Sequence, residues 1–204
     1  MKHLKKLGLA AFAAGALGAF AAAGTASATE LTCSAGVMCA APTAIHAASE
    51  GHATLDSPIG NIQCESTISG EANTGSSTTT VVINNSAFAL FNCTEGLTEH
   101  TLAPGVLEIH TDPANSGTST GNGIVTSTGT EMTVEFRGFH CVFRTNNTEI
   151  GTVTGSVNRG GSTATLDING RIPAVGGRSG IFCGSTSPWT GSSAITTPMY
   201  LDID

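Results

Sequence analysis

The stretch Glu131-Met-Thr-Val-Glu-Phe-Arg-Gly-Phe-His-Cys-Val-Phe-Arg144 decides the fold class of this chain. In each half, every second residue is apolar: Met132, Val134 and Phe136, then Phe139, Cys141 and Phe143. A period of two is typical of a half-buried β-strand, because successive side chains point to opposite faces. Gly138 between the halves predicts a tight bend or a bulge. We therefore predict two neighbouring strands here, with these apolar side chains facing a core.

The same alternation recurs along the chain in short runs that Gly, Asn, Ser and Thr separate. The further strand candidates are residues 53–55, 61–66, 78–83, 88–93, 106–111, 123–127, 151–157, 163–169, 179–183 and 194–202. Turn signals such as Asn84-Asn85 and Asn169-Gly170 lie between or beside them. Turns about every 8–12 residues favour an all-β fold. We predict a single β-sandwich, or a flattened barrel, of about 9–11 short strands.

The N-terminus has the features of an export signal. Three lysines and one histidine lie in residues 1–6, and an apolar run of Leu, Ala, Phe and Gly follows over residues 7–23. Ala26-Ser-Ala28 then supplies small residues at the positions that a signal peptidase recognises. The competing interpretation is a transmembrane anchor, but the run is at the short end for spanning. We predict a signal peptide over residues 1–28.

The remainder divides simply. Residues 29–51 are rich in Ala and hold Cys33 and Cys39, so we expect an N-terminal extension with one local loop. Residues 52–204 are expected to form the all-β domain, whose length suits one domain.

Six cysteines and no Cys-x-x-Cys spacing predict structural disulfides. The sequence leaves the connectivity open. We favour Cys33–Cys39 as a local loop, with Cys64–Cys93 and Cys141–Cys183 each joining two strands. Zinc and redox sites are the alternatives, but both usually need the closely spaced pairs that are missing here.

The charge balance excludes one class of partner and argues against another. After the first six residues the chain holds five arginines, no lysine and all 15 acidic residues. Nucleic-acid binding is excluded, because phosphates are bound by clustered Lys and Arg. By the same reasoning an anionic membrane surface is disfavoured as a partner, and no membrane span is expected once the signal is removed. No cofactor is expected either, since no phosphate-binding Gly-rich loop precedes a helix.

Val106-Leu-Glu-Ile-His-Thr-Asp112 is the strongest candidate for a metal site. Glu108, His110 and Asp112 share one face of the predicted strand, and one imidazole with two carboxylates is a plausible ligand set for a divalent cation. The alternative is an ordinary polar outer face opposite Leu107 and Ile109, which the alternation alone predicts.

Other motifs point more weakly to chemistry. Gly117-Thr-Ser119-Thr-Gly121 matches a nucleophile elbow, but no helical pattern follows it, so we interpret it as a loop. Trp189 lies in a Ser/Thr-rich segment, where it would either stack on a ligand or close one end of the core. Carboxylate pairs such as Glu131 and Glu135 would serve a glycosidase only if a sugar cleft lay between them. We therefore name no catalytic residue.

The body of the chain resembles a group of uncharacterised, secreted, cysteine-containing β-rich proteins of bacteria, especially actinobacteria. The stretches that carry this resemblance are Ile59-Gly-Asn-Ile-Gln-Cys-Glu-Ser-Thr67, Phe91-Asn-Cys-Thr94, Gly105-Val-Leu-Glu-Ile-His110, Gly121-Asn-Gly-Ile-Val-Thr126, Phe139-His-Cys-Val-Phe143, Ile181-Phe-Cys-Gly184 and Pro188-Trp-Thr190. The resemblance implies an exported, cysteine-bridged β-domain, and it supports the Cys64–Cys93 and Cys141–Cys183 pairings. It implies no activity and leaves Cys33 and Cys39 outside.

Together these observations predict an exported extracellular or cell-surface protein with a structural or binding role, whose partner is an unidentified extracellular or cell-wall component. A secreted hydrolase acting on glycans or esters is one alternative, and it would need converging Asp, Glu or His side chains in a cleft. A secreted inhibitor or small-ligand carrier is another. The carrier would need a large apolar cavity.

Overall fold

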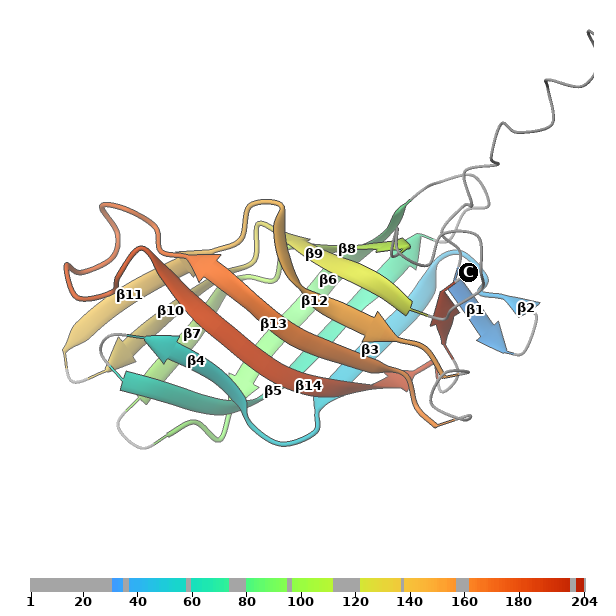
Figure 1. Ribbon diagram of the computed structural model, residues 1–204, viewed down its shortest axis with the longest axis horizontal. Coiled ribbons are helices and arrows are strands. Elements are labelled where there is room, and N and C mark those ends of the chain that lie inside the picture. Colours follow the sequence, from blue (N-terminus) through green and yellow to red (C-terminus); the bar gives the residue numbers. More distant parts are fainter. Residues whose placement is uncertain are drawn as a thin grey trace, which may run out of the picture.

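A computed structural model describes residues 31–34, 37–57, 60–73, 80–94, 97–111, 122–136, 138–156, 162–198 and 201–203. These residues form strands and connecting loops, which confirms the predicted all-β class (Figure 1). The strands are β1 (Leu31–Ser34), β2 (Val37–Met38), β3 (Thr43–Ser49), β4 (Ala53–Ser57), β5 (Gly60–Asn73), β6 (Thr80–Phe91), β7 (Leu97–Ala103), β8 (Val106–Thr111), β9 (Asn122–Thr128), β10 (Glu131–Phe136), β11 (Phe139–Arg144), β12 (Thr148–Thr154), β13 (Thr165–Pro173), β14 (Thr186–Thr197) and β15 (Asp202–Ile203).

The main sheet is a closed antiparallel barrel, which settles the choice between sandwich and barrel. Its strands follow the order β13-β12-β9-β8-β6-β5-β3-β14. A continuous register between β13 and β14, from Thr165 opposite Ala194 to Pro173 opposite Thr186, joins the two ends of this order. Strand β4 pairs with both β5 and β14 beside the barrel. Closure leaves none of the eight strands as an open edge.

The N-terminal segment is part of the barrel, so the predicted boundary at residue 52 is wrong. Strand β3 lies between β5 and β14, and Thr43–Ala48 pair with residues 67–72 of β5. Ile45 and Ala47 are buried while His46 and Ala48 are partly exposed. The alternation is therefore present, but the small alanines on both faces hide it from hydropathy.

Two predicted turns lie inside long strands. The two strands expected at 78–83 and 88–93 are one strand, β6, and the Asn84-Asn85 turn between them is a register shift against β5 between Ser69 and Gly70. The backbone N–H of Asn85 donates to the carbonyl of Gly105, and its amide donates to the carbonyl of Pro104. Asn169-Gly170 likewise lies within β13. At Asn84-Asn85 a bulge uses the same residue types as a turn, which explains that error. Asn169 and Gly170 instead pair in continuous register with Thr190 and Trp189 of β14.

The core fills the barrel lumen with aliphatic side chains. Along β5 the residues alternate between buried and partly or fully exposed over nearly the whole strand, as the pleat requires. All eight barrel strands contribute to one apolar cavity of about 30 Å³ at the centre. Its lining residues are Ile45, Ala47, Ile68, Gly70, Ile83, Leu107, Ile109, Val125, Val153, Leu166 and Ile195. An eight-stranded barrel is just wide enough for side chains to fill, and this one is filled.

A second sheet extends the barrel wall at one end. Strands β11, β10 and β7 pair antiparallel in that order, and they lie at the left of Figure 1. Each connects directly to a barrel strand: β7 to β8, β9 to β10, and β11 to β12. The small sheet β15-β1-β2 lies at the opposite end.

A buried hydroxyl cluster holds the junction between the barrel and the second sheet. Ser127 Oγ lies 2.9 Å from the hydroxyls of both Thr130 and Thr145. Thr130 donates to the carbonyl of Pro104, 2.9 Å away. These hydrogen bonds join the β7–β8, β9–β10 and β11–β12 connections to one another. Gly105 has φ +67°, and a Cβ there would collide with Thr130. Buried hydroxyls that satisfy one another in this way stabilise a specific arrangement of the strands.

The closeness of β12 and β13 makes a testable prediction. A Cβ at Gly151 would collide with the backbone carbonyl of Asp167, which cannot move without breaking the sheet. We expect Gly151→Ala to lower the free energy of unfolding in urea by about 1–3 kcal/mol, the usual cost of overpacking.

Gly176→Ala is the matched control, because a Cβ there meets nothing within 4 Å. It should change the unfolding free energy by less than about 0.5 kcal/mol. Equal urea midpoints for the two variants would contradict the described register of β12 and β13.

Candidate functional site

Three large apolar side chains stand exposed together at the end of the second sheet. Phe139 begins β11 just after Gly138, whose φ of +83° turns the chain back from β10. Phe182 packs edge-on against it, with ring centroids 5.1 Å apart. The exposed fractions are 40% for Phe139, 53% for Phe182 and 91% for Ile181. We call these three residues the apolar tip.

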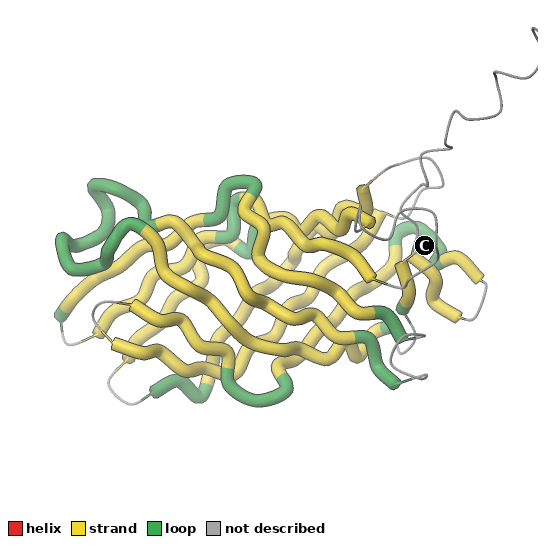
Figure 2. The backbone as a smooth tube through the Cα atoms, viewed as in Figure 1, coloured by secondary structure: helices red, strands yellow, loops and turns green. Residues whose placement is uncertain are grey.

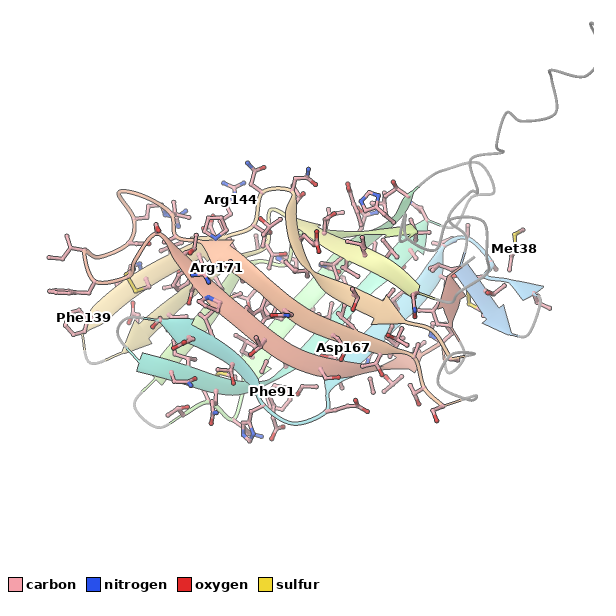
Figure 3. The ribbon with its side chains drawn as sticks, in the orientation of Figure 1. Met38, Phe91, Phe139, Arg144, Asp167 and Arg171 are labelled. Carbon is pink, nitrogen blue, oxygen red and sulfur yellow. A yellow bond between two sulfur atoms is a disulfide. The ribbon has the colours of Figure 1, made fainter. Side chains whose placement is uncertain are left out.

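The predicted inward position of Phe139 is wrong. The alternation predicts an inward face of Phe139, Cys141 and Phe143, but in β11 the buried residues are Cys141, Val142 and Phe143. The strand begins outside the core, because the hairpin projects beyond the end of the barrel (Figure 3). The strand predicted at 179–183 is also wrong, since these residues form turns. Ile181-Phe182 between Gly180 and Gly184 is the one signal that would have revealed an exposed apolar loop.

The loop that carries Ile181 and Phe182 is fastened along β11. It runs from residue 174 to residue 185 beside that strand (Figure 2). The N–H of Val175 donates to the carbonyl of Val142 at 2.8 Å, and the N–H of Gly180 donates to the carbonyl of His140 at 2.9 Å. The Ser179 hydroxyl contacts both the N–H and the carbonyl of Val142. The tip is therefore held in place by backbone bonds on both of its segments.

Charged groups brace the same region. The carboxylate of Glu131 is only 12% exposed, and it accepts a hydrogen bond from Arg178 at 2.8 Å. Arg144 lies 3.8 Å from its other oxygen. Further along the same β10–β11 pair, Glu135 lies 3.0 Å from Nδ1 of His140, the residue opposite it. Because Arg178 belongs to the loop and Glu131 to β10, their ion pair ties the loop to the hairpin.

The three disulfides have the connectivity favoured by the sequence analysis. They join Cys33 to Cys39, Cys64 to Cys93 and Cys141 to Cys183. The last bond joins β11 to the loop directly behind the apolar tip. Three disulfides are typical of a protein that folds in an oxidising compartment.

The proposed metal ligands are brought together only in part. Glu108 and His110 lie on the outer face of β8, with Oε2 and Nε2 3.7 Å apart. His110 also lies within hydrogen-bonding distance of the hydroxyls of Thr80 and Thr126. Asp112 lies outside the described residues, within which no cluster of three metal-ligating side chains occurs. The metal site stays a prediction.

Trp189 belongs to the core and not to a ligand surface. It lies in β14, and not in a loop, with 4% of its surface exposed and its ring 5.6 Å from that of Phe88. This placement corresponds to the alternative interpretation, in which Trp189 closes an end of the core. Ser119 lies outside the described residues.

Comparisons with known proteins identify no relative: no family model, curated protein or solved structure matches the chain. Among the described residues there is also no helix long and apolar enough to cross a bilayer.

The position of the Cys141–Cys183 bond makes a prediction about stability. It closes a longer stretch of chain than Cys33–Cys39, with sequence separations of 42 and 6. On the chain-entropy account, replacing both cysteines of the long bond by serine should cost roughly 4 kcal/mol of unfolding free energy, against roughly 2 kcal/mol for the short one.

Urea unfolding of the two double-serine variants measures this difference. If the Cys33–Cys39 variant were the less stable of the two, the length of the closed loop would not decide how much each bond stabilises the protein.

Proposed function

We propose that the protein is an exported extracellular or cell-surface β-domain with a structural or partner-binding role and no catalytic one, and that the apolar tip is its binding surface. The single observation that carries this proposal is the tip itself. Ile181 exposes 91% of its surface and directly precedes Phe182, whose half-exposed ring packs against that of Phe139. A contiguous exposed apolar cluster is characteristic of interaction sites.

The construction of the tip supports a role in binding. Its two segments are joined by the Cys141–Cys183 bond and by hydrogen bonds to His140 and Val142. A surface held rigid before binding loses little conformational entropy when a partner covers it, so a small contact is used efficiently. The disulfide and the hydrogen bonds thus hold the apolar side chains in fixed positions at the surface.

The small size of the cavity in the barrel lumen favours binding at the surface over binding inside the barrel. Its cavity of about 30 Å³ is roughly a tenth of the smallest pockets that hold drug-sized molecules. A carrier of such molecules would need the closed wall to open. The exported location is supported by the N-terminal sequence and by the three disulfides.

Secretion from a bacterial host tests the proposal. The recovered protein should have the mass of residues 29–204 with all six cysteines oxidised. Wild-type protein should be retained on the washed cell envelope, and the triple variant Phe139→Ser, Ile181→Ser, Phe182→Ser should be released into the medium several-fold more, because the apolar contact is lost.

The control is Val37→Ser with Met38→Ser at the opposite end of the molecule, where the exposed fractions are 59% and 54%. This variant should be retained like wild type. Free thiols, or equal release of all three proteins, would contradict the proposed function.

A further inference from the structure

We infer that the centre of the barrel binds a small, uncharged, apolar molecule of about two or three non-hydrogen atoms, or a single large atom such as xenon. The site is the cavity of about 30 Å³ in the lumen. The inference goes beyond the proposed function, because this cavity is separate from the apolar tip and needs no partner at the surface.

The lining of the cavity contains no hydrogen-bonding side chain. Apart from Gly70, every residue that lines it carries an aliphatic side chain, and these residues come from all eight barrel strands. Two buried side-chain atoms among the described residues have no hydrogen-bond partner, Ser66 Oγ and Asn85 Oδ1. Neither Ser66 nor Asn85 lines the cavity. A polar or charged ligand would therefore lose its hydrogen bonds to water without replacement.

The backbone around the cavity forms its hydrogen bonds within the wall. Ala47 lies opposite Ile68 of β5 and, on its other side, opposite Ile195 of β14. Val153 lies opposite Leu166 of β13. Because ladder hydrogen bonds run between neighbouring strands, they point along the wall and not into the lumen. A buried water molecule needs about two to four polar partners, and this lining offers none, so we expect the cavity to be dry.

The closed wall keeps the cavity from collapsing. Each of the eight strands is paired on both sides, so no strand can move inward without breaking hydrogen bonds to its neighbours. The side chains around the cavity lack contacts on the side that faces it, and a molecule placed there would supply these dispersion contacts. Transfer of an apolar molecule from water to such a site is favourable.

The size of the cavity limits the ligand. An apolar cavity of about 150 Å³ binds benzene as well as xenon. The cavity in the barrel has roughly a fifth of that volume, so it excludes benzene and larger rings. It accepts an apolar molecule of the size of dioxygen or a xenon atom. Xenon is the suitable probe, because it is uncharged and forms no hydrogen bonds.

Methyl NMR under rising xenon pressure tests the inference. In protein with isotopically labelled isoleucine methyl groups, the signals of Ile45, Ile68, Ile109 and Ile195, which line the cavity, should shift along one common saturating curve. Ile181 is 91% exposed, so its methyl signals should shift only in proportion to the pressure. Ile181 is therefore an internal reference for nonspecific contact with xenon.

Two substitutions fill the cavity and one is a matched control. Ala47→Val adds two methyl groups to the lining and should abolish the saturating shifts, because the added atoms occupy the site. Ala48→Val adds the same two groups to the next residue of β3, which is partly exposed on the outer face, and should bind xenon like wild type. Val153→Ile adds one methyl group from β12 and should weaken binding. If Ala47→Val does not fold, the comparison of Val153→Ile with Ala48→Val decides.

The inference is overturned by isoleucine shifts that stay linear with pressure in the wild type, or by saturating shifts that survive in the filled variants. Cross-relaxation between water and the lining methyl groups would also overturn it, because it would show a hydrated cavity. None of these results changes the expected retention on the cell envelope, since that measurement depends on the apolar tip.

Discussion

The pairing of β14 is the constraint on which the rest of the structure depends. This strand forms nine paired positions with β13 on one side and pairs with β3 on the other. Without it, β3 and β13 would be open edges, and the aliphatic lumen would face water on one side. Trp189 in the same strand packs on Phe88 of β6, so closure and core packing are made by one element. The closed barrel therefore keeps its apolar side chains in the lumen, and the loops and the second sheet lie outside it.

The barrel positions the tip through the hydroxyl cluster of Ser127, Thr130 and Thr145. These groups fix the level at which three strands leave the barrel for the second sheet. The β10–β11 hairpin consequently projects in a set direction, and the Cys141–Cys183 bond adds the neighbouring loop to it. A chain of local interactions thus connects barrel closure to the exposure of three apolar side chains.

A strand could be predicted from the sequence when large apolar side chains lie on one of its faces and polar side chains on the other. Val106–Thr111 was predicted with its exact bounds, because Leu107 and Ile109 alternate with polar residues. Strand β3 escaped detection, since alanines on both faces give no contrast. The tip escaped for a different reason: alternation predicts which side chains share a face, but only the fold shows that Phe139 lies beyond the end of the core. Closure of the sheet is likewise a property of long-range pairing, which periodicity does not contain.

Hydrogen–deuterium exchange of the backbone amides tests the closed barrel most directly. Amides in a continuous ladder exchange through cooperative opening, whereas loop amides exchange locally. The account predicts that residues 43–49, 165–173 and 186–197 are among the slowest to exchange and that they open together. Exchange of 43–49 or 186–197 as fast as that of the loop 174–185 would contradict it.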